Sequence, residues 1–282
     1  MRASIAFNHP LSPAYRHLGV AAPDFPGAFQ AGQFVMIRPP AILDPFLPRA
    51  FSIYRISAAP PAGASPAARR GPVVEILYKV VGKGTQLLAG MEPGREVEIL
   101  GPLGNAFAVP DDLGLAVLVA GGIGVPPIAA LARQMRNAGF GMRNVEVFLG
   151  GKTSDDILCL KDFDTAGVRV RISTEDGSLG TCGLITDLLD PFVAARHAPR
   201  PTPQESPLAI FTCGPLGMLA AVAKLAEKYG VPCQTSVEAN MACGFGACMG
   251  CATPVRSNGS GPAYKLVCKD GPVFDARELV WR

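Results

Sequence analysis

Histidine and charged residues are scarce in this 282-residue sequence, which has 3 histidines and only 17% charged residues. The 26 basic and 23 acidic residues nearly balance, and basic clusters such as Arg69-Arg70 are short. This pattern argues against nucleic acid or an anionic membrane surface as the partner. His9, His17 and His197 lie in proline-rich or loop-like contexts that are typical of the surface. We therefore expect no nucleic-acid or membrane partner and assign no catalytic residue.

An uninterrupted apolar helix is also missing. The first 20 residues hold no apolar run of signal-peptide length, so we expect them to be mature sequence. Residues 113–132 are uncharged and about long enough to cross a bilayer, but glycines and prolines interrupt their middle. A buried strand, a turn and a helix are expected there instead. The 8 cysteines, without a secretory signal, indicate a reducing compartment, and we expect a cytoplasmic protein.

Residues 1–112 are expected to form a small antiparallel β-barrel. Short runs rich in β-branched and aromatic residues, divided by proline and glycine, occur at 32–37, 50–56, 73–81 and 96–100. The segment 59–72 is rich in alanine, proline and arginine, which is typical of a solvated loop inserted in a hairpin.

Residues 113–235 are expected to form an α/β domain. From residue 115 onward, apolar runs alternate with helical stretches, which indicates a parallel sheet covered on both faces. The segment 194–207 holds proline, arginine and polar residues, and we expect it to loop out. The remaining residues, 236–282, are rich in glycine and cysteine and are too few for a conventional core. We expect this third module to depend on a stabilising cross-link, such as a bound metal or a disulfide.

Three thiols lie close together in the segment MACGFGACMGC. Cys243, Cys248 and Cys251 have the spacing C-x4-C-x2-C, and Cys268 follows after a segment rich in polar residues. This is the plant-type spacing for a [2Fe-2S] cluster, and the intervening glycines permit the loop to bend around the metal. A structural zinc site and a disulfide pair are the alternatives, although zinc sites favour paired C-x2-C knuckles and only one is present. The isolated thiols are interpreted as small buried hydrophobes; they are Cys159, Cys182 and Cys233.

Two glycine turns are expected at the carboxyl ends of the parallel strands. The first holds Gly121, Gly122 and Gly124 between a predicted strand and a predicted helix. The second is Cys213-Gly214-Pro215, after another apolar strand. Backbone N–H groups in such turns can bind a pyrophosphate, and two turns in one sheet frame a ligand crevice. A purely structural turn is the alternative for the first.

Further candidate residues lie in the predicted barrel and beside the cysteine loop. The barrel residues are Arg49, Ala50, Phe51 and Ser52, followed by Leu77, Tyr78 and Lys79, and then by Gly84 and Thr85. Taken alone, they also fit an ordinary strand face with solvated ends. Glu238, just before the cysteine loop, fits either a hydrogen bond near a cofactor or a solvated strand end.

Together these motifs resemble the ferredoxin-reductase superfamily and, within it, the electron-transfer subunits of the heteromeric, NAD-dependent dihydroorotate dehydrogenases. The resemblance covers almost the whole chain. The motifs that carry it are R-x-F-S at 49–52, GKGT at 82–85, LGPLGNAF at 100–107, GGIGVPP at 121–127, CGPLGM at 213–218, SVEANMACGFGACMGC at 236–251 and VCKDGPVF at 267–274. The cysteine segment and the KDGPVF motif are the most specific of these.

The resemblance implies an FAD-binding barrel, an NAD-binding lobe and a C-terminal [2Fe-2S] module ligated by the four clustered cysteines. Residues 49–52 would contact the isoalloxazine and phosphates of FAD, and residues 77–79 its ring edge and ribityl chain. Gly84 and Thr85 would contact the FAD pyrophosphate. Residues 121–124 and 213–215 would frame the nicotinamide dinucleotide.

The resemblance also implies a partner, the FMN-containing catalytic subunit that oxidises dihydroorotate to orotate in de novo pyrimidine (UMP) biosynthesis. Two copies of each chain would form a heterotetramer. One alternative is the flavin and iron-sulfur subunit of a hydrogenase or a ferredoxin-dependent transhydrogenase. Another is a nucleotide-binding regulator with a zinc knuckle. The direction of electron flow and the choice between NAD and NADP stay open at this point.

Overall fold

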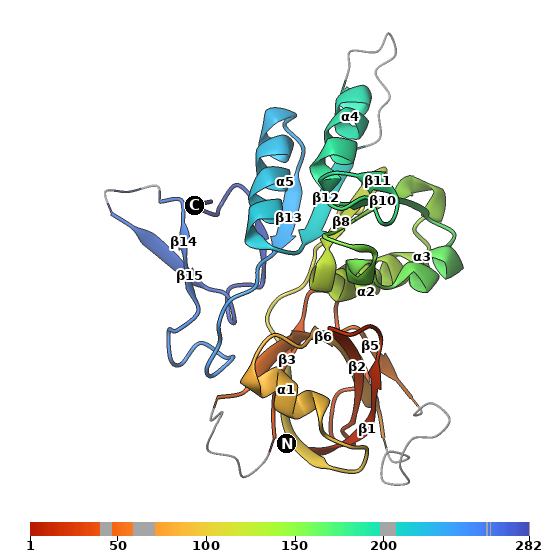
Figure 1. Ribbon diagram of the computed structural model, residues 1–282. Coiled ribbons are helices and arrows are strands. Elements are labelled where there is room, and N and C mark those ends of the chain that lie inside the picture. The colour runs from red at the N-terminus through yellow and green to blue at the C-terminus, as the bar shows by residue number, and fades with distance from the viewer. Residues whose placement is uncertain (40–46, 59–70, 198–206, 258, 260, 282) are drawn as a thin grey trace.

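The computed structural model describes residues 1–39, 47–58, 71–197, 207–257, 259 and 261–281. Across these residues it contains two seven-stranded sheets and a two-stranded hairpin (Figure 1). The first sheet lies in the N-terminal third, the second in the middle of the chain, and the hairpin near the C-terminus. The fold expected from the sequence, an antiparallel barrel joined to a parallel α/β lobe and a small cysteine-rich module, is confirmed.

The first sheet is antiparallel and curves into a barrel (Figure 1). Its strands follow the spatial order β4-β3-β7-β1-β2-β6-β5. Apolar side chains from most of these strands, among them Ile5, Leu18 and Val35, meet inside it. The elements are β1 (Arg2–Pro10), β2 (Tyr15–Ala21), β3 (Phe34–Arg38), β4 (Arg49–Ser52), β5 (Arg55–Ser57), β6 (Val73–Lys79), α1 (Lys83–Ala89) and β7 (Glu96–Leu103).

The run predicted as one strand at 50–56 forms two strands, because the chain changes partner in its middle. Strand β4 pairs with β3, and β5 pairs with β6. Between them the Ile53 N–H donates to the Gln33 carbonyl, whereas the next N–H, of Tyr54, donates to the Glu75 carbonyl. Strands β5 and β6 form the expected hairpin, and its inserted segment, 59–70, lies outside the described residues.

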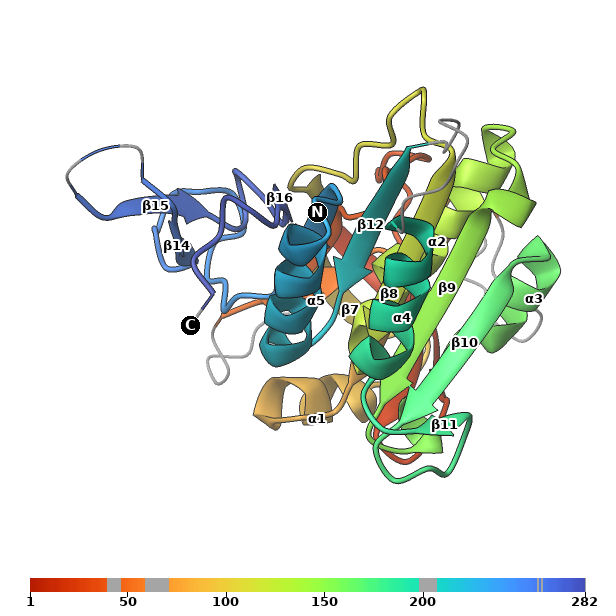
Figure 2. The same cartoon turned by 90° about the horizontal axis from the view of Figure 1, so that it is seen from above.

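The second sheet is parallel except at one edge, and its order is β11-β10-β9-β8-β12-β13-β16. Helices α2 and α3 cover one face, and α4 and α5 cover the other (Figure 2). The elements are β8 (Leu115–Gly121), α2 (Val125–Asn137), β9 (Val145–Gly151), α3 (Leu160–Ala166), β10 (Arg169–Thr174), β11 (Thr181–Cys182), α4 (Ile185–His197), β12 (Leu208–Cys213), α5 (Leu216–Lys228), β13 (Cys233–Ser236) and β16 (Val273–Asp275), with short 3-10 turns at Gly122–Gly124, Met142–Asn144 and Ser154–Asp156.

The apolar stretch at 113–132 is a buried strand, a turn and a helix, as expected. Every residue of β8 is buried. Among the described residues, no helix is long and apolar enough to cross a membrane. The expectation of a loop over all of 194–207 is wrong at its start, since α4 continues to His197; residues 198–206 lie outside the described part.

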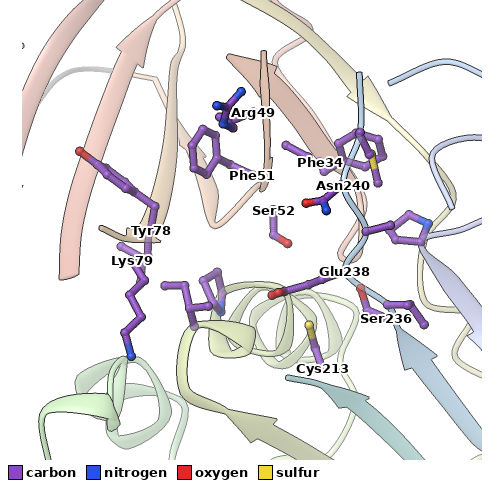
Figure 3. A pocket seen from close by; sticks show the side chains of 18 of the residues that line it. Phe34, Arg49, Phe51, Ser52, Tyr78, Lys79, Cys213, Ser236, Glu238 and Asn240 are labelled. Atoms are coloured by element: carbon purple, nitrogen blue, oxygen red, sulfur yellow. The ribbon is translucent and has the colours of Figure 1, made fainter. Parts of the chain in front are cut away.

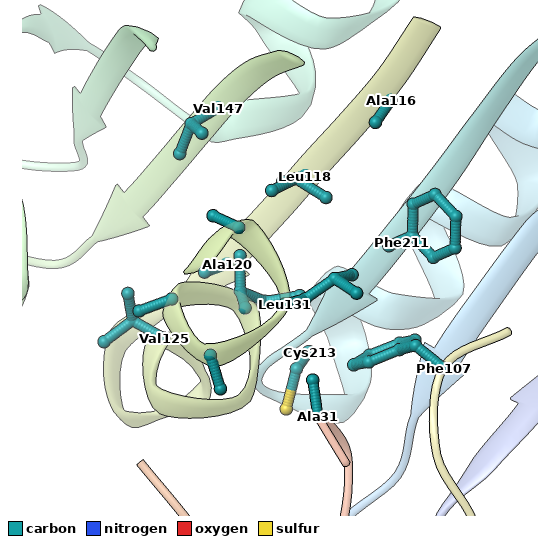
Figure 4. Packing of buried hydrophobic residues seen from close by; sticks show 14 of the residues in the cluster. Ala31, Phe107, Ala116, Leu118, Ala120, Val125, Leu131, Val147, Phe211 and Cys213 are labelled. Carbon is teal, nitrogen blue, oxygen red and sulfur yellow. The ribbon is translucent and has the colours of Figure 1, made fainter. Parts of the chain in front are cut away.

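One apolar core joins the barrel to the lobe. Helix α2 supplies more of its residues than any other element, and Ala31 and Phe107 from the barrel side pack against it (Figure 4). The Phe107 ring meets the Phe211 ring edge-on, with centroids 5.9 Å apart. Because this core is continuous, the two parts have a fixed mutual orientation.

The C-terminal module is too small to form a hydrophobic core of its own. It packs against the barrel and pairs with a strand of the lobe. Its hairpin consists of β14 (Ala252–Val255) and β15 (Ala263–Leu266). Phe34 and Met36 of the barrel pack with its apolar residues, including Cys251 and Cys268. Strand β16 returns to pair antiparallel with β13 at the edge of the second sheet.

Candidate functional site

The first candidate site is a cavity of about 590 Å³ between the barrel and the lobe (Figure 3). It brings together eight of the nine barrel residues that the sequence singles out: Arg49, Ala50, Phe51, Ser52, Leu77, Tyr78, Lys79 and Thr85. Two further wall residues, Cys213 and Glu238, were also candidates from the sequence. All its other wall residues come from β3, the turns after β6 and β8, α2, the ends of β12 and β13, the segment after β13 and the position before β16. These are Phe34, Val81, Ile123, Pro126, Cys213, Ser236, Val237, Glu238, Ala239, Asn240, Met241 and Pro272.

Aromatic rings form the barrel side of this first cavity. The Phe51 and Tyr78 rings meet edge-on, with centroids 5.6 Å apart. Tyr78 is buried, and burial raises the pKa of its phenol to about 12. Its hydroxyl donates to Asn8 Oδ1 at 3.3 Å, away from solvent. Tyr78 therefore offers an apolar wall and no proton near neutral pH.

Arg49 supplies a positive charge at one end of the first cavity. Its Nη1 donates to the Leu47 carbonyl at 2.7 Å, and its Nε and Nη2 lie beside Gly84 of helix α1. Gly84, the ninth barrel residue, does not line the cavity; a Cβ there would lie 2.9 Å from Arg49 Nε. Thr85 Oγ1 accepts the N–H groups of Val81 and Gly82 and so holds the turn before α1. The arrangement suits a phosphate group, because guanidinium forms strong charge-assisted hydrogen bonds to phosphate oxygens.

The second candidate site is a cavity of about 440 Å³ at the carboxyl ends of β8, β9 and β12. Gly121, Gly122, Gly214 and Pro215 line it, as the glycine turns predict. Gly150, Gly151 and Lys152, at the end of the second parallel strand, and Gly217 and Met218, of the CGPLGM motif, also line it. The remaining wall residues had no recognisable sequence signal; they include Tyr15, Asp156, Glu175, Leu184 and Thr186.

Two residues predicted to frame the dinucleotide lie elsewhere. Gly124 is absent from the second cavity's wall, and a Cβ there would lie 2.4 Å from the Cys213 carbonyl oxygen. Gly124 thus allows the start of α2 to pack against β12. Cys213 lines the first cavity rather than the second, and burial, followed by the charge of Glu238, raises the pKa of its thiol.

The two cavities share a wall. Lys79, Ile123 and Glu238 line both of them. The Glu238 side chain is reached by solvent from the cavities, yet protein surrounds it closely enough that desolvation raises the pKa of its carboxyl. Molecules bound in the two cavities would therefore meet at this wall.

The four clustered cysteines form two neighbouring pairs. The Cys248 N–H points to Cys243 Sγ at 3.5 Å, and the Cys268 N–H points to Cys251 Sγ at 3.4 Å. Within the described residues, no three His, Cys, Asp or Glu side chains converge on one ion position. Two pairs of thiols fit two irons with two thiolates each, whereas a tetrahedral zinc site would require all four to converge.

The cysteine loop favours thiolates. Backbone N–H groups, of Phe245 above all, lower the pKa of Cys243 to about 6. Gly244 and Gly246 have φ angles of 83° and 91°, as expected for a loop that bends around a metal. The isolated thiols Cys159 and Cys233 are half-buried and buried, but Cys182 is exposed, so its interpretation as a buried hydrophobe is wrong.

Comparisons with known proteins agree with this architecture. The family model for the iron-sulfur cluster binding domain of dihydroorotate dehydrogenase B matches residues 238–280, and the oxidoreductase NAD-binding domain matches residues 118–224. The solved structure of an NADH-dependent reduced ferredoxin-NADP oxidoreductase superposes with a TM-score of 0.77, at 24% identity, over 99% of this chain and 90% of that one. The superposition thus shows a ferredoxin-reductase-like fold, and the matched NAD-binding model is that of an oxidoreductase.

Two curated relatives resolve the family within this class. Both are named dihydroorotate dehydrogenase B (NAD(+)), electron transfer subunit. The one from Desulforamulus reducens is 32% identical over 96% of this chain and 94% of its own length. The one from Geobacillus kaustophilus is 40% identical over 89% of this chain and 87% of its own length. The chain belongs to the family of electron transfer subunits of NAD-dependent dihydroorotate dehydrogenase B.

Proposed function

We propose that the chain relays electrons between NAD(H) and the FMN of a dihydroorotate dehydrogenase catalytic subunit, by way of FAD and a [2Fe-2S] cluster. The observation that carries this proposal is the wall of Lys79, Ile123 and Glu238 shared by the two cavities. When bound, a flavin exchanges electron pairs with a nicotinamide and single electrons with an iron-sulfur cluster. The chain's own contribution is to hold these groups side by side.

The barrel, residues 1–112, would bind FAD in the first cavity. Arg49 would neutralise the phosphates, and Gly84 and Thr85 would shape the turn against which they lie. Ala50, Phe51 and Ser52 would contact the isoalloxazine, and Leu77, Tyr78 and Lys79 its edge and the ribityl chain. The support for these roles is that eight of the nine residues line one cavity and that Gly84 packs against Arg49.

The lobe, residues 113–235, would bind NAD(H) in the second cavity. Gly121, Gly122 and Gly214 have no side chains, so a dinucleotide can approach the backbone closely. Pro215 would complete this wall. Gly124 and Cys213 would act less directly, since Gly124 sets the packing of α2 on β12 and Cys213 faces the neighbouring cavity.

The module at residues 236–282 would hold the [2Fe-2S] cluster. Cys243 and Cys248 would ligate one iron, and Cys251 and Cys268 the other. The pairing of their sulfurs and the N–H groups directed at them support this assignment. Hydrogen bonds to cluster sulfurs of this kind tune the reduction potential.

The partner would be the FMN-containing catalytic subunit that oxidises dihydroorotate to orotate in UMP biosynthesis, in a heterotetramer with two copies of each chain. The names of the curated relatives support a partner subunit, because they are electron transfer subunits of a larger enzyme. We place the complex in the cytoplasm, where the eight free thiols of this chain would stay reduced.

The proposal is tested on the full chain purified anaerobically. We expect about one FAD and about two irons per chain with no stoichiometric zinc, and an EPR signal after dithionite reduction. Bound NAD⁺ should be detectable by calorimetry. A colourless, folded protein that contains zinc would contradict the proposal. Co-purification with a hydrogenase subunit instead of an FMN-containing subunit would contradict the assignment of the partner.

A matched pair of variants tests the cluster ligands. Cys268→Ala should lose most of the iron, because a [2Fe-2S] cluster needs four ligands. Cys233→Ala removes an equally buried but isolated thiol and should retain the wild-type iron content. Equal iron content in the two variants would exclude Cys268 as a ligand.

A further inference from the structure

The barrel and the lobe are linked at the second cavity by a three-residue contact. Asp156, in the turn after β9, lies opposite Tyr15 of β2 and Lys79 of β6, which are direct partners in the barrel sheet. Asp156 Oδ1 accepts the Tyr15 hydroxyl at 2.5 Å and Lys79 Nζ at 3.3 Å. The Lys79 ammonium also lies 4.9 Å from the centre of the Tyr15 ring. All three side chains line the second cavity.

The other oxygen of Asp156 holds its own loop. Asp156 Oδ2 accepts the backbone N–H groups of Lys152 at 2.9 Å and Thr153 at 3.3 Å. The loop that follows β9 is therefore folded around the same carboxylate that attaches it to the barrel. Although burial opposes it, the hydrogen bonds from Tyr15, the backbone and Lys79 keep the pKa of Asp156 below its usual range, so the group is ionised at neutral pH.

This contact adjoins the parts of the second cavity that a dinucleotide would touch. The Tyr15 hydroxyl lies 3.6 Å from the place where a Cβ on Gly122 would be. A Cβ on Gly151 would lie 2.8 Å from Asp156 Cβ. Lys79 belongs to the wall between the two cavities. A movement of Asp156 would thus displace the β9 loop, Tyr15 and Lys79 together.

The geometry points to Asp156 as a positioning residue. It fixes the loop at residues 151–157 to the barrel and so holds the second cavity at a constant width before NAD(H) binds. The inference rests on the proposed binding of NAD(H) in that cavity. A site that is preorganised binds more tightly, because less conformational freedom is lost on binding. Asp156 and Tyr15 would act through the loop, not on the reacting atoms.

The chain contains a matched control for this contact. Tyr54 also joins the barrel to the lobe, since its hydroxyl donates to Asp162 Oδ2 of α3 at 2.6 Å. Tyr54 is buried like Tyr15 but lines neither of the two cavities. Tyr15→Phe and Tyr54→Phe therefore each remove one hydroxyl from a tyrosine–aspartate bond across the same interface, with only the first beside the second cavity.

The test uses the full chain with its cofactors bound, and measures the NAD⁺ dissociation constant by calorimetry and amide exchange of residues 151–157 by mass spectrometry. We expect Tyr15→Phe to raise the dissociation constant by about fivefold and to accelerate exchange in the loop, because a hydrogen bond to a charged group is lost. Turnover of NADH with an artificial acceptor should show a raised KM with an unchanged kcat. Tyr54→Phe should change the dissociation constant by less than about twofold.

Three outcomes would overturn the inference: an unchanged dissociation constant in Tyr15→Phe, unchanged loop exchange, or an equal loss of affinity in Tyr54→Phe. If Tyr15→Phe fails to fold, Asp156→Asn provides a second test. It removes the charge that attracts Lys79 and leaves one side-chain oxygen for either Tyr15 or the Lys152 and Thr153 N–H groups, so it should also raise the dissociation constant and accelerate exchange in the loop. A wild-type chain that binds no NAD⁺ would refute the proposed function itself, which is a different result from wild-type binding with unaffected variants.

Discussion

At the scale of single residues, the glycines of the candidate sites act for different physical reasons. Gly84 leaves room for a guanidinium, Gly124 leaves room for a carbonyl, and Gly244 adopts a left-handed backbone conformation. All three belong to motifs quoted from the sequence, but only the structure separates their roles. Each role leads to a different result on adding one methyl group.

Gly84→Ala should weaken FAD binding. The new methyl group would lie 2.9 Å from Arg49 Nε and would displace the guanidinium from the phosphate end of the first cavity. Loss of one charge-assisted contact of about 1.5–3 kcal/mol corresponds to a roughly 10- to 100-fold higher dissociation constant for FAD. The measurement is the equilibrium release of FAD, followed by flavin fluorescence.

Gly82→Ala is the control for this change, since nothing lies within 4 Å of the added Cβ and its φ of −171° is open to any residue. It should bind FAD as the wild type does. Equal weakening of FAD binding in both variants would show that FAD affinity depends on the turn before α1 and not on the position of Arg49.

Gly244→Ala should reduce the iron content. Its φ of 83° is unfavourable for alanine by about 1–2 kcal/mol, and the methyl group would lie 2.5 Å from Met36 Cγ. Gly250→Ala in the same loop meets only Cys248 Sγ, at 3.5 Å, and should retain its iron. Iron per chain after anaerobic purification distinguishes the two variants. Comparable iron content in both would mean that the loop tolerates rearrangement around the cluster.

Candidate site residues in short motifs could be predicted from the sequence, but contacts between residues far apart in the chain could not. The four cysteines and residues 49–52 lie in short motifs whose chemistry is visible in the order of the residues. Tyr15 and Asp156, in contrast, are 141 positions apart and belong to no motif. Their meeting depends on the packing of the barrel against the lobe, which no local pattern specifies.

At the scale of elements, strands with a continuous apolar sequence were predictable, whereas short or interrupted elements were not. Strand β8 is apolar throughout, so its burial in a parallel sheet was evident. Helix α1 has only seven residues and contains a glycine, which gives little helical signal. The division of 50–56 into β4 and β5 depends on two hydrogen-bond partners that lie far apart in the sequence.

Gly124→Ala should lower the free energy of unfolding of the chain even when no nucleotide is bound. The methyl group would lie 2.4 Å from the Cys213 carbonyl oxygen, so α2 and β12 would have to separate. Forced overpacking of this kind costs about 1–3 kcal/mol. Denaturant unfolding of the chain without added nucleotide measures this cost.

Gly217→Ala tests the same exchange in helix α5, where nothing lies within 4 Å of the added Cβ. It should stabilise the chain slightly, by up to about 1 kcal/mol, because alanine favours the helix. A Gly124→Ala variant as stable as the wild type would refute the packing role and would return Gly124 to the group of direct nucleotide contacts.

At the scale of the whole molecule, the three segments expected from composition are interlocked. The core around β8 includes Ala31 and Phe107 from outside the lobe, and the cysteine-rich module packs on Phe34 and Met36. Strand β16 closes the edge of the second sheet from the far end of the chain. Sequence composition shifts mark where a segment begins, but they do not show which partner completes its core.

The interface between barrel and lobe should therefore weaken in acid. The ordinary pKa of an aspartate is 3.8, and the hydrogen bonds that hold the Asp156 pKa below this value favour its ionised form in the folded chain. Its stabilisation is complete above about pH 5 and is lost as the pH falls through the lowered pKa. Asp156→Asn should cost about 1–2 kcal/mol at pH 7, or a few degrees in Tm, and should lose less stability than the wild type between pH 5 and pH 3.

Thermal unfolding of both chains across this pH range measures the difference between their slopes. Asp155→Asn, which changes an exposed carboxylate of the same turn, should keep the wild-type slope. Glu75, whose pKa the His17 and Arg55 hydrogen bonds lower against the opposing effect of burial, is unchanged in all three chains and contributes equally to each. Parallel curves for the wild type and Asp156→Asn would mean that Asp156 gains no stabilisation from its charge, and that this charge does not strengthen the interface between barrel and lobe.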